Sequence, residues 1–136
     1  MPVEHINPPG SPLVEGIAQI SLATGSRLAF FSGQVGRLGD GSPAGQDLRS
    51  QTAQALRNLE VLGNVINVTA EDIAKVTILV KDYDPSKFEE FMAGFDDYVE
   101  EGGRLGTVPS ASTLVGVTSL YEPWCLVEIE AIAVLP

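Results

Sequence analysis

The residues best suited to chemistry are two glutamates in the last apolar segment of the chain. Glu128 and Glu130 alternate with apolar residues over 126–133, so in a strand both carboxylates lie on one face, about 7 Å apart. A carboxylate among apolar neighbours must be paired, solvated or protonated. Either glutamate could therefore serve as a general acid or base, or anchor a ligand. The alternative is a polar patch at a subunit contact, or ion pairs to Arg27 or Arg104.

The other reactive residue types support fewer kinds of chemistry. The one histidine, His5, lies in a proline-rich segment, so we do not expect a Ser-His-Asp triad. The one cysteine, Cys125, excludes an intrachain disulfide and a multi-cysteine metal site, and it is expected to be a packed, inert thiol. Residues 36–41 contain glycines without the Gly-Lys-Ser/Thr ending of a phosphate-binding loop, which indicates a turn. Residues 109–113 offer donors that could bind a small anion or simply begin a strand. We expect neither a metal nor a cofactor.

The composition is typical of one globular domain spanning residues 1–136. The chain has 8 Lys and Arg against 18 Asp and Glu, a formal net charge of -10. Because the cations are also scattered, binding to nucleic acid is disfavoured. We find no signal peptide and no apolar run of about 18 residues, so we expect a cytoplasmic protein with no membrane partner. With 44% hydrophobic residues and a mean hydropathy of +0.15, some apolar surface should be buried between subunits.

Apolar periodicity predicts five strands. Residues 1–16, rich in Pro and Gly, are expected to form an N-terminal arm. Alternation predicts a strand over 17–22, and an apolar run predicts a second one over 28–35, covered on both faces. The turn at 23–26 would join these two strands as a hairpin. Further strands are predicted at 75–81, 112–118 and 125–134.

Two helices are predicted between the strands. The first covers 46–62, and the second begins at 84–86 and ends at Gly102. Capping boxes are expected for the pairs Thr69 with Asp72 and Ser86 with Glu89. The predicted core stripes are Leu48, Ala55, Leu56, Leu59 and Leu62 in the first helix, and Phe88, Phe91, Phe95 and Tyr98 in the second. The polar face of the first helix would carry Gln51, Gln54, Arg57 and Asn58.

The order of elements is β-β-α-β-α-β-β, which predicts an α+β fold with one sheet and both helices on one of its faces. The second face of the sheet would then need a cover. Another subunit is the obvious candidate.

Several segments, taken together, resemble one family. They are SGQVG at 32–36, the pattern DL..QT..AL.NL at 47–59, KVT..VKD at 75–82, PSASTLVGV at 109–117 and VEIEAIA at 127–133. In this order they resemble the RidA/YjgF family, also called endoribonuclease L-PSP proteins, from about Gly10 onward. The resemblance implies a chorismate-mutase-like sheet and a homotrimer with three clefts between subunits.

The resemblance also implies a reaction and its residues. The best-known family activity is hydrolysis of enamines and imines such as 2-aminoacrylate to 2-keto acids and ammonia. Glu128 matches the glutamate that orients the attacking water, and the turn formed by Ser32, Gly33 and Gln34 matches the backbone-donating motif. The arginine that holds the substrate carboxylate has no match, because its place falls at Ala111 or Ser112. Other ligand-contacting positions fall near Leu13, Met92 and Leu114.

These departures shape the functional expectation. We expect a homotrimer that binds a small neutral or weakly polar metabolite between subunits and lacks the usual deaminase activity. Glu128 would anchor the ligand, with hydroxyls of Ser112 or Thr113 nearby. One alternative is an imine deaminase in which Arg104 replaces the missing cation. A second is a structural or interaction protein with vestigial clefts. The family's ribonuclease label is disfavoured by the net charge.

Overall fold

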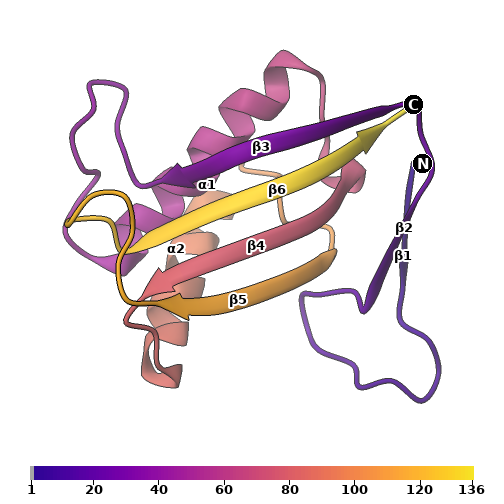
Figure 1. Cartoon of the computed structure of the whole chain (residues 1–136), viewed down its shortest axis with the longest axis horizontal. Helices are drawn as coiled ribbons and strands as arrows, with labels where there is room; N and C mark the ends of the chain where they lie inside the picture. The colour runs from indigo at the N-terminus through magenta and orange to yellow at the C-terminus, as the bar shows by residue number, and fades with distance from the viewer. Residues whose placement is uncertain (1) are drawn as a thin grey trace.

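The computed structural model describes residues 2–136, which form a mixed four-stranded sheet with two helices on one face (Figure 1). The strands lie in the order β3, β6, β4, β5. Their bounds are Arg27–Val35 for β3, Val127–Leu135 for β6, Ile73–Lys81 for β4 and Ala111–Val117 for β5. β6 pairs antiparallel with both β3 and β4, while β4 and β5 run parallel. The α+β prediction and its order of elements are confirmed.

The two helices lie behind the sheet in Figure 1 and cross each other there. α1 spans Leu48–Val65 and α2 spans Phe88–Glu100. A short 3-10 turn at Ala70–Asp72 precedes β4, and a second one at Pro85–Lys87 precedes α2. No helix within residues 2–136 is long and apolar enough to cross a membrane.

Side-chain caps fix where the helical segments begin. Asp47 accepts a hydrogen bond from the backbone N–H of Ser50 at 2.7 Å, which caps α1. The predicted box of Thr69 and Asp72 is present. The second predicted box is wrong, because Asp84 rather than Ser86 is the cap and accepts from the N–H of Ser86 at 2.8 Å. The carboxylate of Asp84, two residues before Ser86, thus satisfies a backbone N–H that the tight turn leaves without a partner.

The core lies between the sheet and the helices. It consists of the inward apolar residues of β4 and β6 and the facing sides of α1 and α2, with Leu105 from the loop before β5. Three helix assignments need correction. Gln51 is completely buried, whereas Leu62 and Phe88 are exposed. Leu62 lies near the end of α1 and Phe88 at the start of α2, where the two helices no longer cover each other.

The N-terminal segment differs from the prediction. β1 (Val3–Ile6) and β2 (Ile20–Ala23) form their own two-stranded antiparallel sheet. The predicted hairpin between residues 17–22 and 28–35 is therefore wrong, since β2 pairs with β1 and β3 pairs with β6. Two hydrogen bonds hold the small sheet against the main one: Nε2 of His5 donates to the carbonyl of Ile73 at 3.1 Å, and the N–H of Ala111 donates to Oγ of Ser21 at 3.0 Å.

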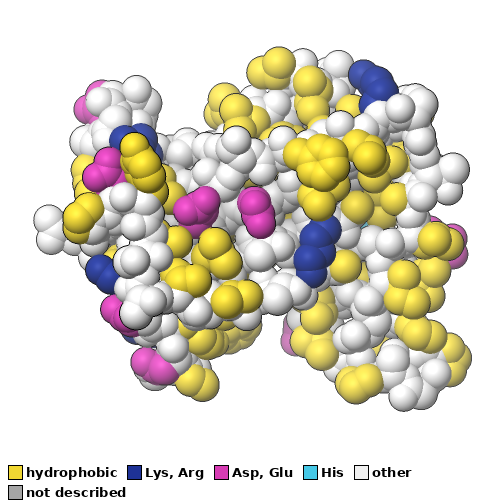
Figure 2. Space-filling model, in the orientation of Figure 1, with side chains coloured by type: hydrophobic (Ala, Val, Ile, Leu, Met, Phe, Trp, Pro, Cys, Tyr) yellow, Lys and Arg dark blue, Asp and Glu magenta, His cyan; other side chains and the backbone are white. Residues whose placement is uncertain are grey.

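The face of the main sheet opposite the helices leaves apolar side chains of β3 exposed in the single chain. Phe30 is 72% exposed and Leu28 is 63% exposed, so the prediction that β3 is covered on both faces is wrong for one subunit. The register places Glu130 and Lys75 on the same face, beside Thr77 and Ile132 respectively. Figure 2 shows this face, on which a few charged side chains lie among hydrophobic ones.

Candidate functional site

The candidate site begins with a bulge in β3. Phe31 pairs with Ala131 and Gln34 with Ile129, so β3 has one residue more than β6 across the same interval. The extra residue falls at Ser32 and Gly33. Such a bulge interrupts the ladder and redirects side chains. Nε2 of Gln34 donates to the carbonyl of Ser32 at 3.1 Å, so the side chain of Gln34 provides a partner for a backbone acceptor at the bulge.

Glu128 packs directly over this bulge. A Cβ built on Gly33 would lie 2.7 Å from Cδ of Glu128 and would overlap its carboxylate. The glycine therefore leaves the space that the carboxylate occupies here, and a larger residue 33 would displace it. Glu128 is half-buried, and it pairs with Leu79 on one side and Val35 on the other. Among residues 2–136, neither Glu128 nor Glu130 forms an ion pair, so the alternative of pairs to Arg27 or Arg104 is not seen.

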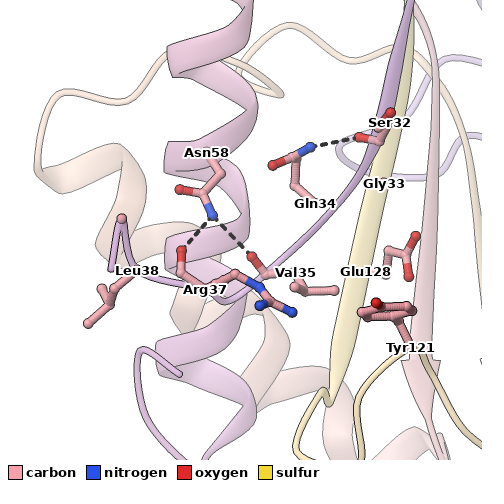
Figure 3. Close-up of a pocket in the computed structure, with 10 residues that line it drawn as sticks. Ser32, Gly33, Gln34, Val35, Arg37, Leu38, Asn58, Tyr121 and Glu128 are labelled. Atoms are coloured by element: carbon pink, nitrogen blue, oxygen red, sulfur yellow. Dashed lines mark hydrogen bonds between the residues drawn. The ribbon is translucent and has the colours of Figure 1, made fainter. Parts of the chain in front are cut away.

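The bulge and Glu128 line a hollow of about 560 Å³ at the end of β3 (Figure 3). Its walls come from β3, the loop after it, α1, the loop before β6, and β6 itself. The lining residues are Ser32, Gly33, Gln34, Val35, Arg37, Leu38, Gly39, Asn58, Tyr121 and Glu128. The hollow thus combines a carboxyl group, two amides and a guanidinium with an aliphatic and an aromatic wall.

A chain of hydrogen bonds from side chains of α1 holds the end of β3 in place. Nδ2 of Asn58 donates to the carbonyls of Val35 at 3.1 Å and Arg37 at 2.9 Å (Figure 3). The side chain of Gln54 donates to Oδ1 of Asn58 at 3.0 Å, and Arg57 donates to Gln54. Asn58 therefore fixes the backbone at the end of β3, which forms one wall of the hollow. Its position on the helix had predicted a side chain that faces solvent.

Gln51 holds the opposite wall. Its Nε2 donates to the carbonyls of Gly45 at 2.9 Å and Trp124 at 3.0 Å, and its Oε1 accepts from the N–H of Leu126 at 2.8 Å. The amide thus ties the loop after β3 to the loop before β6. Gln51 can be completely buried because backbone groups of other segments satisfy its amide.

A cation lies in the same hollow. The guanidinium of Arg37 lies 5.3 Å from the ring centroid of Trp124 and 3.7 Å from Oε1 of Glu122. Tyr121, which is 84% exposed, forms the wall next to Glu128 (Figure 3). The sequence contained these residues without a motif to single them out, since they belong to loops whose course is set by the rest of the fold.

The structure brings together only part of the predicted set. Ser32, Gly33, Gln34 and Glu128 share the hollow. The remaining predicted residues lie outside it in the single chain: Leu13, Met92, Ala111, Ser112, Thr113 and Leu114. Three belong to the first half of β5, which β4 separates from β6. Met92 and Leu114 pack against the core on the helix side, and Leu13 lies exposed in the segment between β1 and β2.

The cations near the predicted clamp position also differ from expectation. Arg104 lies in a separate hollow of about 350 Å³, where Glu60 and Glu71 also lie. The cation beside the start of β5 is Lys75, which pairs with Ala111 and donates to Oγ1 of Thr113 at 2.6 Å. Thr113 and Ala111 therefore lie on the uncovered face with Lys75.

The remaining candidates have structural roles. Cys125 is fully buried, and burial raises the pKa of its thiol above the usual range, as expected for an unreactive cysteine. His5 holds the small sheet against β4. Within residues 2–136 no three His, Cys, Asp or Glu side chains gather as metal ligands. The polar groups that line the hollow, Glu128, Arg37 and the amides, can form hydrogen bonds and ion pairs.

Known proteins similar to this chain agree with this fold. A structure of YyfB from Yersinia pestis, described as a protein of unknown function of the conserved Rid family, is 29% identical, with a TM-score of 0.87 over 99% of this chain and 100% of that one. The YjgF gene product of E. coli is 26% identical, with a TM-score of 0.66 over 96% and 98%. A Mycobacterium tuberculosis member of the YjgF/YER057c/UK114 family is 27% identical, with a TM-score of 0.62 over 89% and 88%. Among curated proteins, none matches the chain.

The family profile gives the same answer over nearly the whole length. The profile described as Endoribonuclease L-PSP matches residues 15–135, which include every element from β2 to β6. The chain therefore belongs to the endoribonuclease L-PSP family, the group that also carries the RidA and YjgF names.

Proposed function

We propose that this protein is a homotrimer that binds a small metabolite in clefts between its subunits, with Glu128 as the polar anchor. The observation that carries the proposal is the packing of Glu128 over Gly33 at the β3 bulge, inside a hollow lined by amides and backbone groups. A carboxyl group that is positioned by close packing, yet has no ion-pair partner within residues 2–136, remains available to a ligand.

The uncovered sheet face supports assembly. Phe30 and Leu28 on β3 and Val115 on β5 expose apolar surface on this face, and exposed apolar surface on a small domain favours burial against a copy of itself. Trimer formation would also bring a second subunit near the hollow. The first half of β5, with Ala111, Ser112 and Thr113, lies across the sheet from its own Glu128, so these residues would contribute from a neighbouring subunit.

The start of β5 argues against the usual deaminase reaction. Ala111 or Ser112 stands where the resemblance implies an arginine, and the nearby cation, Lys75, is engaged by the hydroxyl of Thr113. An ammonium group cannot form the planar two-bond contact that a guanidinium makes with a carboxylate. We therefore propose that this protein does not hydrolyse 2-aminoacrylate-type imines in the manner of the family's deaminases.

One observation favours the enzyme alternative. Glu128 and Arg37 line the same hollow, so a general base and a cation are both present. In this alternative, Glu128 orients a water molecule that adds to the C=N carbon, and ammonia leaves to give the 2-keto acid.

The test is imine hydrolysis, with the imine generated in place by an amino-acid oxidase. The protein is compared with a no-protein control, and its oligomeric mass is measured in the same sample. We expect a trimer and no acceleration. Acceleration by the wild type that is abolished in Glu128→Gln would contradict the proposal and establish the deaminase alternative. A monomer under these conditions would contradict the proposed assembly.

A further inference from the structure

The hollow at Glu128 contains a guanidinium that is held in place but retains unused donors. The carbonyl of Arg37 is fixed by Asn58, and its guanidinium lies 5.3 Å from the Trp124 ring. The carbonyl of Trp124 is in turn fixed by Gln51. Within residues 2–136 the guanidinium donates no hydrogen bond, and its one ion pair, to Glu122, is long at 3.7 Å.

This arrangement is suited to binding an anion. A guanidinium presents five N–H donors in a planar fork that matches a carboxylate. The cation–π contact with the indole limits the orientations of the guanidinium and reduces the conformational entropy lost on binding. Glu122 lies close enough to compete for the fork, but its separation of 3.7 Å leaves it easily displaced.

The other nearby cations are less suitable for this role. Nζ of Lys75 donates to Thr113 at 2.6 Å on the uncovered face and does not line the hollow. Arg104 lies in the separate hollow with Glu60 and Glu71. Arg37 is the cation that shares a cavity wall with Glu128 in the described part of the chain.

We propose that Arg37 binds the carboxylate of the ligand and is the main determinant of ligand specificity at this site. The inference rests on the proposed binding function and names its ligand class. The ligand is a small monocarboxylate with an N–H or O–H group that donates to Glu128, and its carbon body contacts Leu38 and Tyr121. This replaces the neutral ligand expected from the sequence, because Arg37 supplies the cation that the start of β5 lacks.

A pair of probes that differ only in the carboxylate tests this assignment. The probes are 2-hydroxybutanoate and its neutral amide, 2-hydroxybutanamide, each titrated into the full-length protein. Binding is followed by calorimetry and by the fluorescence of Trp124, the only tryptophan of the chain. The variants are Arg37→Gln, Glu122→Gln, Lys75→Gln and Glu128→Gln. Arg104→Gln is the matched control, because it removes an exposed guanidinium outside the hollow.

We expect the wild type to bind the carboxylate about tenfold or more tightly than the amide, since charge-assisted hydrogen bonds contribute more than neutral ones. Arg37→Gln should remove this preference and leave amide binding unchanged. Glu122→Gln should tighten carboxylate binding by a few-fold, as it frees the fork. Arg104→Gln should behave as the wild type.

Three outcomes overturn the inference. Carboxylate binding that survives Arg37→Gln but is lost in Lys75→Gln moves the anion site to the start of β5. Equal binding of both probes that is lost in Glu128→Gln removes the role of Arg37 and leaves the proposed binding function intact. Binding of neither probe to the wild type overturns the ligand class, while the proposed function is decided separately by its own imine assay and oligomeric mass.

Discussion

Gly33 and Glu128 lie on neighbouring strands, and the absence of a Cβ at residue 33 is what leaves room for the carboxylate. The atoms that a Cβ would meet are Cγ, Cδ and Oε2 of Glu128, the flexible end of a side chain. The consequence of adding a methyl group is therefore a shift of Glu128 rather than a rearrangement of the sheet. The position of the Glu128 carboxylate therefore depends on which residue stands at position 33.

For Gly33→Ala we expect retained folding and binding of 2-hydroxybutanoate weakened by about tenfold, because the carboxylate leaves its position. Calorimetric titration measures the binding, and thermal unfolding followed by circular dichroism measures the stability. Gly63→Ala is the control, since residue 63 lies outside the hollow and a Cβ there makes only ordinary contacts of 3.6 Å or more. Unchanged binding in Gly33→Ala would mean that this contact does not position Glu128.

Among the elements, the helices provide the rigid support of the site. α1 reaches the end of β3 through Asn58 and the two flanking loops through Gln51. α2 is joined to α1 by two Arg-carboxylate pairs, Arg49 with Asp97 and Arg57 with Glu101. α2 also holds the segment after it, because the hydroxyl of Tyr98 accepts from the N–H groups of Arg104 at 3.0 Å and Leu105 at 2.8 Å.

The Tyr98 contact predicts a pH dependence. Burial raises the pKa of Tyr98 to about 12 from the usual 10. Between these values the folded chain keeps a proton that the unfolded chain releases, so the free energy of unfolding falls as pH rises through this window, by up to about 3 kcal/mol. In Tyr98→Phe the slope should be shallower, and stability at pH 7 lower by about 1–2 kcal/mol because two N–H groups lose their acceptor.

Urea unfolding at several pH values from 8 to about 11.5 measures this effect, a window below the raised pKa of Tyr98. Tyr121→Phe is the control, because its ring is exposed and its stability profile should follow that of the wild type. Identical slopes for Tyr98→Phe and the wild type would contradict the linkage.

For the molecule as a whole, the sheet face opposite the helices is the surface through which the proposed trimer would form. It carries the most exposed apolar residues of β3 beside Glu130 and Lys75. The net charge of -10 opposes association. The proposed assembly would therefore rely on apolar burial at this face.

Phe30→Asp should abolish the proposed trimer, because it places three like charges in a surface that must become dry. Light scattering should then report a single chain of 14.4 kDa. The fold should persist, since Phe30 is largely exposed in the single chain. Val61→Asp, an equivalent change on the exposed side of α1, should leave the oligomeric mass unchanged. A trimer in both variants would exclude this face as the interface.

The sequence predicted the local features well. Alternation over 126–133 places Glu128 and Glu130 on one face, and the register confirms this by pairing them with Leu79 and Thr77. The pairing of strands was predicted less well, because the hairpin between β2 and β3 does not form. A short turn permits a hairpin, but the small sheet gains its contacts to Ile73 and Ala111 instead.

The sequence by itself determined the fold class, the extent of most elements and the family, because these follow from periodicity and from motifs read along the chain. Only the tertiary structure decided that Gln51 is buried, that β3 bulges over Glu128, and that Arg37 shares its hollow. These features depend on contacts between segments far apart in sequence. Strand register and loop course set such contacts, and neither leaves a local pattern in the sequence.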